Sequence, residues 1–337
     1  RSRGLVDTLL YDAEVDSLAL RRAGRHATSL SLARYVERTP RPSGGKRIAL
    51  VVAEGEIVPG RNRESPTEGR LLGAETLIQA LREARRRHSI RAIVLRVDSP
   101  GGSAQASDDI WHEVERCRRA KPVIVSMSDY AASGGYYIAV PADSIVAEPS
   151  TLTGSIGIFG GKLNLLGLYH KLGLNVQTLS RGAHAGMFSA FRDFTPDEAR
   201  LYREQLEQNY HGFIQRVAHG RARSEGWAES VAGGRVWTGT AARARGLVDA
   251  FGGIEAAIEM ARARAGIPRD EEVEIERLPR PKRPFLSAFL QGLVGDEDDA
   301  SDRLGEALPP ALQLLIAAAR LPAGQTLALM PYRIEVR

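Results

Sequence analysis

The sequence predicts a mainly parallel α/β fold. Apolar, strand-like runs alternate with segments of helical periodicity, and turns rich in glycine follow several of the strands. This alternation favours right-handed crossovers, which place successive strands parallel in one sheet. At 337 residues the chain can bury a sizeable core, and its hydrophobic share of 43% and charged share of 26% are typical of globular proteins.

The composition argues against several classes of function. The net charge is +5, but basic and acidic residues are interleaved, which indicates a solvated surface and no nucleic acid partner. The single cysteine, Cys117, excludes an internal disulfide, and the seven histidines lack metal-ligand spacing, so we expect no metal and no cofactor. No run reaches the about 20 apolar residues of a membrane span, so we expect any membrane anchor to lie outside this chain.

The first 45 residues predict a boundary region. The sequence Arg-Gly-Leu-Val-Asp occurs at residues 3–7 and again at 245–249, each time before a candidate helix. We interpret residues 1–23 as the tail of an amino-terminal repeat whose body is missing, which fits a chain that begins with Arg. Residues 24–45 are interpreted as a connector, because they end in a cluster of proline and glycine.

The next hundred residues predict a regular alternation of strands and helices. Period and apolar content predict strands at 47–53, 90–97, 123–125 and 144–147, and helices at 73–87, 106–120 and from 134 to about 140.

The later part of the chain predicts further helices and a change of character at its end. We expect a helix at 163–172, a strand at 175–179, a loop at 181–196, a helix from the Thr195 cap to about 219, a strand at 235–239, and helices at 240–245 and 252–264. Residues 276–337 contain clustered prolines, an acidic run at 296–299 and an amphipathic stretch at 308–321. We interpret them as a packing or oligomerisation arm.

Two glycine turns follow neighbouring strands and predict a catalytic centre. Asp98-Ser99-Pro100-Gly101-Gly102 follows one strand, and Ala132-Ser133-Gly134-Gly135 follows the next. The carboxyl ends of parallel strands lie at one edge of a sheet, where ligands bind. Backbone N–H groups of Gly101 or Gly102 and of Gly134 could therefore converge beside the Ser133 hydroxyl, as an oxyanion hole beside a nucleophile.

The order of the motifs resembles the signal peptide peptidase A family, also called protease IV. The resemblance runs over roughly residues 45 to 265 and rests on the motifs at 95–103, 121–127, 131–137, 151–160 and 236–239. It implies a ClpP/crotonase-like fold, a repeated ββα spiral with added helices, over residues 46–275. It also implies a Ser–Lys dyad that cleaves released signal peptides, in a homo-tetramer anchored to the bacterial inner membrane with its active domain on the periplasmic side.

Carried over by motif, the resemblance assigns roles to four residues. Ser133 is the nucleophile, Gly101 and Gly134 supply the oxyanion N–H groups, and Ser155 in Thr-Gly-Ser-Ile-Gly orients the lysine. From the sequence alone, we would instead interpret Ser155 as a strand-edge hydroxyl bonded to backbone.

The lysine base is where the sequence departs from a self-sufficient enzyme. The short form of the family takes its base from a Gly-x-Tyr-Lys segment, which here reads Gly182-Ala183-His184-Ala185. The long form takes it from the amino-terminal half, so we expect the base to lie outside this chain. Lys162 and Lys171 are weak internal candidates, and His184 is another.

Two competing interpretations remain open at this stage. A crotonase-type acyl-CoA hydratase or isomerase shares the fold but uses a carboxylate, and no acidic residue adjoins Gly134. A catalytically silent scaffold repeat would keep Ser133 without a base. For a peptidase, we expect the peptide substrate to add as a strand beside the segment after Gly154.

Overall fold

The computed structural model describes residues 7–8, 10, 12–24, 27–28, 30, 35, 45–65, 69–280 and 327–329. The chain divides into a first unit, Arg1–Gly44, and a second unit, Gly45–Arg337. In the first unit, helix α1 spans Asp12–Ala23. Most of the corner at residues 3–7, most of the proposed connector and the proposed helix at 308–321 lie outside the described residues.

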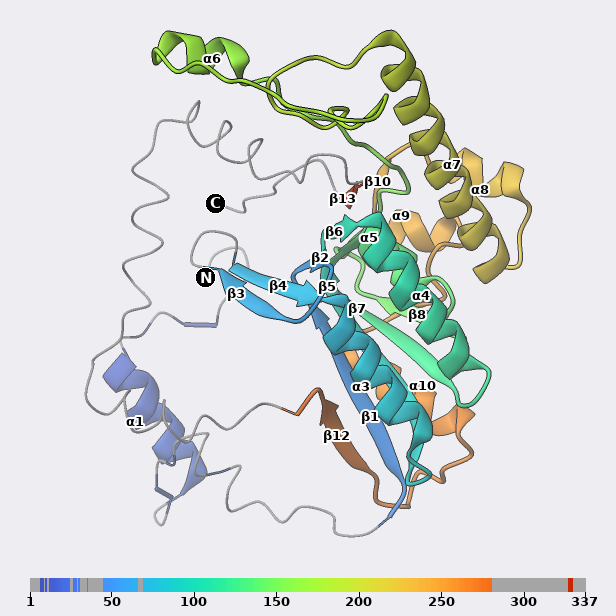
Figure 1. Ribbon diagram of the computed structural model, residues 1–337. Coiled ribbons are helices and arrows are strands. Elements are labelled where there is room, and N and C mark those ends of the chain that lie inside the picture. The colour runs from blue at the N-terminus through green and yellow to red at the C-terminus, as the bar shows by residue number, and fades with distance from the viewer. Residues whose placement is uncertain are drawn as a thin grey trace. The chain divides into compact units, whose positions relative to one another are not determined.

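The second unit is built on a large, mostly parallel sheet (Figure 1). Its strand order is β10-β9-β7-β5-β1-β12, and β8 and β11 extend it from β7. Apart from the antiparallel β9–β10 pair, the ladders of this sheet are parallel, as the sequence predicts. The strands are β1 (Arg47–Glu54), β5 (Ile90–Ser99), β7 (Val123–Ala132), β8 (Ser144–Ala147), β9 (Leu152–Gly154), β10 (Val236–Thr238), β11 (Ala250–Phe251) and β12 (Glu274–Leu278).

A smaller sheet lies beside the carboxyl ends of these strands. It has the order β13-β6-β2-β4-β3. Its members are β2 (Glu56–Val58), β3 (Arg63–Ser65), β4 (Gly69–Gly73), β6 (Gly101–Ser103) and β13 (Leu327–Leu329). Because β1 leads into β2 and β5 leads into β6 before each helix, the chain shows the ββα units that the family resemblance predicts.

Helices cover both faces of the large sheet. The larger core lies on the side of α3, α4 and α5, and contains Val51, Leu95 and Val125. The smaller core lies under α10 and contains alternate residues of the same strands, such as Val94 and Ile124. This two-sided burial explains the nearly continuous apolar runs from which the strands are predicted. The helices are α3 (Ala74–Arg86), α4 (Ala104–Arg118), α5 (Gly134–Ala139), α6 (Leu166–Lys171), α7 (Pro196–Gly220), α8 (Glu225–Val231), α9 (Gly239–Ala244) and α10 (Ile254–Arg264).

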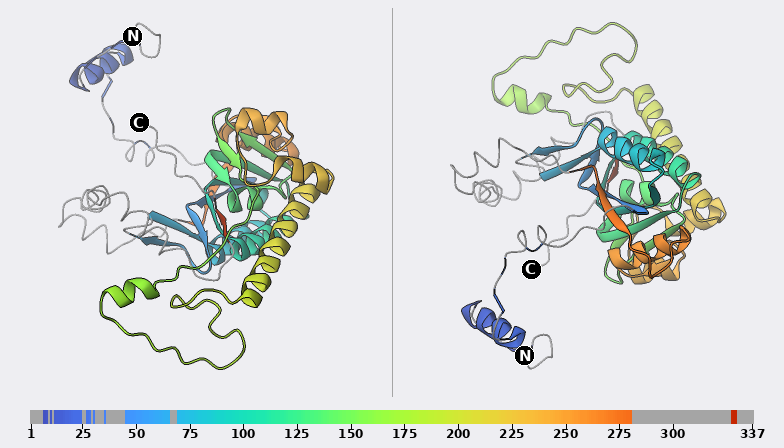
Figure 2. Two further views of the ribbon diagram at one scale, coloured as in Figure 1. Left: turned by 90° about the horizontal axis from the view of Figure 1, so that it is seen from above. Right: turned by 90° about the horizontal axis from the view of Figure 1, so that it is seen from below.

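Segment 158–195 departs most from the sequence prediction. The helix expected at 163–172 is reduced to α6, and the strand expected at 175–179 does not form. That stretch pairs with no described strand, and Leu179 is 89% exposed, so its apolar pattern lacks the neighbour that a strand needs. The segment projects from the core before the chain enters α7 (Figures 1 and 2). The start of α7 follows the prediction, because Thr195 and Glu198 form a reciprocal capping box.

The carboxy-terminal part of the described chain adds two strands. Strand β12 crosses the boundary expected near residue 275 and pairs in parallel with β1. Strand β13 pairs antiparallel with β6, Leu329 opposite Gly101. Among the residues that the structure describes, no helix is long and apolar enough to cross a membrane.

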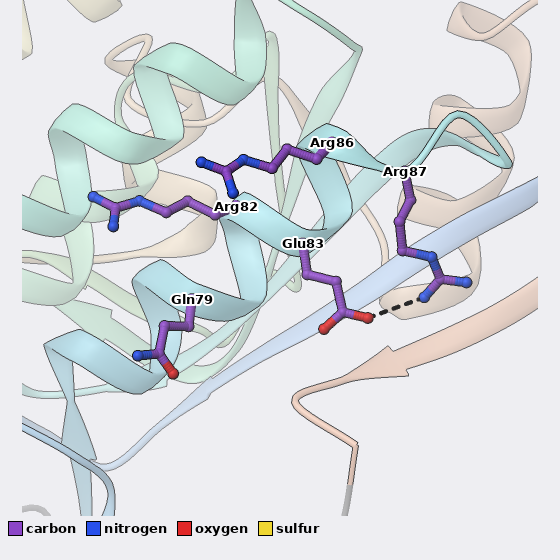
Figure 3. Close-up of a pocket in the computed structure, with 5 residues that line it drawn as sticks. All are labelled: Gln79, Arg82, Glu83, Arg86 and Arg87. Carbon is purple, nitrogen blue, oxygen red and sulfur yellow. Dashed lines mark hydrogen bonds and ion pairs between the residues drawn. The ribbon is translucent and has the colours of Figure 1, made fainter.

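Strand β12 is fastened by an ion pair whose contribution depends on pH. Arg87 donates to Glu276 at 2.7 Å and to the more exposed Glu83 at 3.1 Å (Figure 3 shows the second bond). The pKa of Glu276 is lowered to about 2, and the hydrogen bond from Arg87 is the largest cause. A lowered carboxylate pKa stabilises the fold above its unfolded-state value, and this stabilisation disappears as pH falls through the folded-state pKa.

We therefore expect Glu276→Gln to lower the free energy of unfolding by about 2 kcal/mol at neutral pH. Urea titrations at several pH values measure this difference, which should shrink below about pH 4.5 and vanish near pH 2. Glu83→Gln is the matched control on the same arginine and should cost less than about 0.5 kcal/mol. An equal loss at pH 7 and pH 2.5 would contradict the account.

The first turn of α5 lies very close to the end of β5. A Cβ atom on Gly135 would stand 2.6 Å from the carbonyl oxygen of Ser99. We expect Gly135→Ala to push the two elements apart and to lower the free energy of unfolding by about 1 to 3 kcal/mol. Gly212→Ala in α7, where an added Cβ meets nothing within 4 Å, should instead stabilise the protein by about 0.5 to 1 kcal/mol. Thermal or urea unfolding of both variants measures the two changes in the free energy of unfolding. Equal changes in Gly135→Ala and Gly212→Ala would contradict the close approach of α5 to β5.

Candidate active site

Ser133 lies at the junction between β7 and α5 in a conformation unusual for serine. Its φ is 53° and its ψ is −114°. Its N–H donates to the carbonyl oxygen of Gly154 at 2.8 Å, and its own carbonyl accepts from Tyr137 at 2.8 Å. A non-glycine residue at positive φ costs of order 1 to 3 kcal/mol and persists only when its surroundings enforce it. Such enforced strain is a mark of functional sites.

The Ser133 hydroxyl is buried and chemically unsatisfied. The residue is 0% exposed, and Oγ has no hydrogen-bond partner in the described structure. Leaving a buried hydroxyl unpaired costs about 1 to 3 kcal/mol, which a purely structural residue would avoid. No described base is hydrogen-bonded to this oxygen.

The register of the sheet brings the Gly101 turn level with Ser133. Ser99 on β5 pairs with Ala131 on β7, so the residues two positions further along each strand reach the same level of the sheet edge. Gly101 has φ 103°, and its N–H donates to Oγ of Ser99 at 3.2 Å. Ser99 Oγ in turn donates to the carbonyl of Gly55 at 2.7 Å. The two turns therefore begin at the same level of the sheet, and the Gly101 N–H points to the Ser99 hydroxyl.

Ser155 lies next to Gly154, whose carbonyl accepts the hydrogen bond from the Ser133 N–H. It follows Gly154 directly, is 2% exposed and also has positive φ, at 49°. Its N–H donates to the carbonyl of Arg235 at 2.8 Å. The N–H of Gly234 donates to the carbonyl of Ile156, so this segment already pairs with residues 234–235 along one side. A substrate strand would therefore have to pair with an edge other than the side of this segment that faces residues 234–235.

Of the two internal lysine candidates, Lys162 binds other groups and Lys171 lies at the end of α6. Lys162 Nζ donates to the carbonyl of Met187 at 2.7 Å and lies 4.3 Å from the centroid of the Phe194 ring. Desolvation, and then the nearby charge of Arg192, lower the pKa of Lys162. Lys171 ends α6, which projects away from α5 in all the views (Figures 1 and 2).

The segment that corresponds to Gly-x-Tyr-Lys carries no amine. His184 lies 3.6 Å from Asp197 and 4.0 Å from Glu198, near the start of α7. Ala185 occupies a turn, and its N–H donates to the carbonyl of Gly182. The histidine is therefore placed among carboxylates, with no described contact to the Ser133 oxygen.

Sequence reasoning missed a polar group on the strands that carry the site. Arg96 donates to Ser126 Oγ at 2.8 Å, to the Met127 carbonyl at 2.9 Å and to Ser128 Oγ at 2.9 Å. Asp98 follows two residues later on β5, with one carboxylate oxygen buried and unpaired. The signal was available, since Arg96 and Asp98 interrupt the apolar run of β5 that follows Arg91.

The pocket drawn in Figure 3 does not coincide with this centre. It is lined by Gln79, Arg82, Glu83, Arg86 and Arg87, from α3 and the residue that follows it. We find no group of three or more possible metal ligands among the described residues.

Comparisons with known proteins agree with the motif assignment. Residues 115–268 match the profile of "Peptidase family S49". The chain is 40% identical over 307 residues to "Serine protease SPPA, chloroplastic" of Arabidopsis thaliana, covering 88% of this chain and 45% of that protein. It is 39% identical over 328 residues to "Protease 4" of Salmonella typhi, covering 96% of this chain and 50% of that protein.

Shorter relatives match over most of their length. A putative protease of Methanocaldococcus jannaschii is 33% identical over 234 residues, which are 68% of this chain and 75% of that protein. A solved structure, a mutant of the 1510-N membrane-bound stomatin-specific protease, is 18% identical with a TM-score of 0.43 and covers 70% of this chain and 98% of that chain. The chain thus spans about half the length of the two longer relatives. It belongs to peptidase family S49.

Proposed function

We propose that this chain is the nucleophile-bearing part of a serine peptidase that cleaves peptides through an acyl-enzyme. The observation that carries the proposal is the strained, buried and unpaired Ser133 at a strand–helix junction. Membership of a peptidase family supports the same chemistry. A crotonase-type reaction would need a carboxylate in this place, and the strained residue is a serine.

The proposed reaction has two steps at one oxygen. Ser133 Oγ attacks the carbonyl carbon of the scissile peptide bond while a base takes its proton, and the carbonyl electrons move onto oxygen. When the tetrahedral intermediate collapses, the C–N bond breaks and the amine leaves with a proton from the same base. Water then attacks the acyl-enzyme, which releases the carboxylic acid and returns the proton to Ser133.

Two backbone amides would stabilise the oxyanion. The N–H of Gly134 lies directly after the nucleophile, in the first turn of α5. The N–H of Gly101 would exchange its partner from Ser99 Oγ to the oxyanion. The present bond, at 3.2 Å, lies at the long end of the ordinary N–H···O range. Each such donor typically contributes about 3 kcal/mol to lowering the barrier.

The base in this proposal is a lysine from an amino-terminal half of the same protein. Three findings support this split: Ser133 has no described base, Lys162 is engaged with Met187, and Ala185 occupies the matching position. The half-length coverage of the longer relatives agrees with a second repeat. Ser155, fixed beside Gly154, is proposed to orient that lysine.

The wider setting follows the family resemblance. We propose signal peptides left by signal peptidase as substrates, a homo-tetramer as the assembly, and the periplasmic side of the bacterial inner membrane as the location. We propose that the peptide substrate adds as a strand beside Gly101, in the place on β6 that β13 takes in this structure, and so competes with β13 for it. The reaction needs neither metal nor cofactor.

A fluorophosphonate probe tests the nucleophile. We expect Ser133 to be labelled. In Ser133→Ala the amount of labelled protein, measured by mass spectrometry, should fall at least about 1,000-fold, because the activated nucleophile is removed. Ser107→Ala, which removes a buried hydroxyl that donates to the Ser103 carbonyl in α4, is the matched control and should label like the parent.

The same assay locates the base. Labelling only after the amino-terminal half is added supports the split site, whereas labelling of the isolated chain places a base within residues 1–337. If Ser133 stays unlabelled with both halves present, the chain is a catalytically silent scaffold and the proposed function is wrong.

A further inference from the structure

The helices that follow the two catalytic turns are joined by a hydrogen bond between their side chains. Tyr137, in the first turn of α5, donates from its hydroxyl to Oδ1 of Asp108 in α4 at 2.7 Å. Tyr137 lies four residues beyond Ser133, and α4 begins at Ala104, three residues beyond Gly101. The bond therefore connects the nucleophile turn to the Gly101 turn through the helices that these turns open.

Each end of this bond is attached closely to a catalytic turn. The N–H of Tyr137 donates to the carbonyl of Ser133 at 2.8 Å, which closes the first turn of α5. Ser103 ends β6, the strand that contains Gly101, and its hydroxyl caps α4 by accepting from the N–H of Ala106 at 3.3 Å. Because each helix begins within three residues of its turn, a change in the angle between the helices would move the two turns relative to one another.

Side chains of α7 contact both members of the bond. Arg216 donates from Nε to Oδ1 of Asp108 at 3.3 Å, and its guanidinium lies 4.2 Å from the centroid of the Trp111 ring. The ring of Phe213, which is fully buried, lies 4.5 Å from the ring of Tyr137, centroid to centroid. The Asp108 carboxylate thus has two donors, and the Tyr137 ring has a fixed neighbour.

The Tyr137 hydroxyl is well suited to remain a donor. Tyr137 is 6% exposed. Burial, and then the hydrogen bond to Asp108, raise the pKa of Tyr137, so the hydroxyl keeps its proton where an ordinary tyrosine ionises. Asp108 is partly exposed to water, which places the bond at the lower end of the strength of bonds to charged groups.

We propose that Tyr137 and Asp108 form a brace between α5 and α4 that sets the Gly134 amide against the Gly101 amide. Both are positioning residues, and this role rests on the proposed function of Ser133 as nucleophile. An oxyanion hole needs both N–H groups within hydrogen-bond distance of one oxygen, so a small rotation of α5 relative to α4 would weaken it. The fold itself would persist without the brace, because the apolar faces of both helices pack in the larger core.

Amide hydrogen exchange, followed residue by residue by NMR on the full chain, tests the brace without reference to catalysis. Tyr137→Phe keeps the ring and removes the hydroxyl. We expect it to speed exchange at the amides of residue 137 and of Val140 about 10-fold, as for a lost hydrogen bond to a charged group. Tyr210→Phe is the matched control, because the Tyr210 hydroxyl donates to a carboxylate oxygen of Glu229 at 2.8 Å, between α7 and α8. It should leave exchange in α5 unchanged.

The rate of fluorophosphonate labelling of Ser133 tests the positioning role, in whichever assembly labels the parent. We expect Tyr137→Phe and Asp108→Ala each to slow labelling about 10-fold, because a small misplacement of a catalytic group is costly. The double variant should lie within about twofold of either single variant, since both remove the same bond. Asp108→Asn, which keeps one acceptor oxygen, should recover part of the rate, and Tyr210→Phe should label like the parent.

The outcomes distinguish failure of the brace from failure of the proposed function. An unlabelled parent with both halves present contradicts the proposed function, and with it the positioning role, whatever the exchange rates. Unchanged exchange in α5 of Tyr137→Phe, or an equal increase in Tyr210→Phe, overturns the brace whatever the labelling. Faster exchange together with slower, non-additive labelling supports the proposal. If exchange responds but labelling does not, or if the two single effects multiply, the bond orders α5 without positioning the nucleophile, and the proposal is wrong.

Discussion

The structure depends on holding one serine in a backbone conformation that serine avoids. At φ 53°, Ser133 turns the chain from a buried strand into α5 within a single residue. The hydrogen bond from its amide to Gly154 ties that turn to β9, and the bare Gly135 lets α5 approach the end of β5. The stability of the two-sided core supplies the free energy that this strain and the unpaired hydroxyl consume.

The same sheet also decides where the turn points. In a parallel sheet, neighbouring catalytic loops are placed by strand register, and here the register is interrupted just before both loops. On the face opposite the main core, Arg96 binds Ser126, Met127 and Ser128 where that interruption begins. The position of the catalytic loops would then depend on hydrogen bonds several residues from Ser133, while the apolar faces of the sheet stabilise the fold.

Much of this arrangement could be predicted from local sequence. Apolar runs and helical periodicity predicted the α/β class, and the glycine turns after β5 and β7 placed Ser133 at a strand–helix junction. What failed or was missed depends on non-local partners. The apolar pattern at 175–179 lacks a neighbouring strand, and the bulge opposite Asp98 appears only when the two strands are paired. The engagement of the Gly101 amide by Ser99 likewise cannot be read from residue order.

The most direct test of the central claim is a crystal structure of the chain, joined by its amino-terminal half if labelling requires it, with Ser133 phosphonylated. The account predicts a phosphonyl oxygen within about 3 Å of the Gly134 nitrogen and of the Gly101 nitrogen, with the Ser99 hydroxyl released from the latter. A phosphonyl group bonded to Ser133 whose oxygens contact neither amide would contradict it.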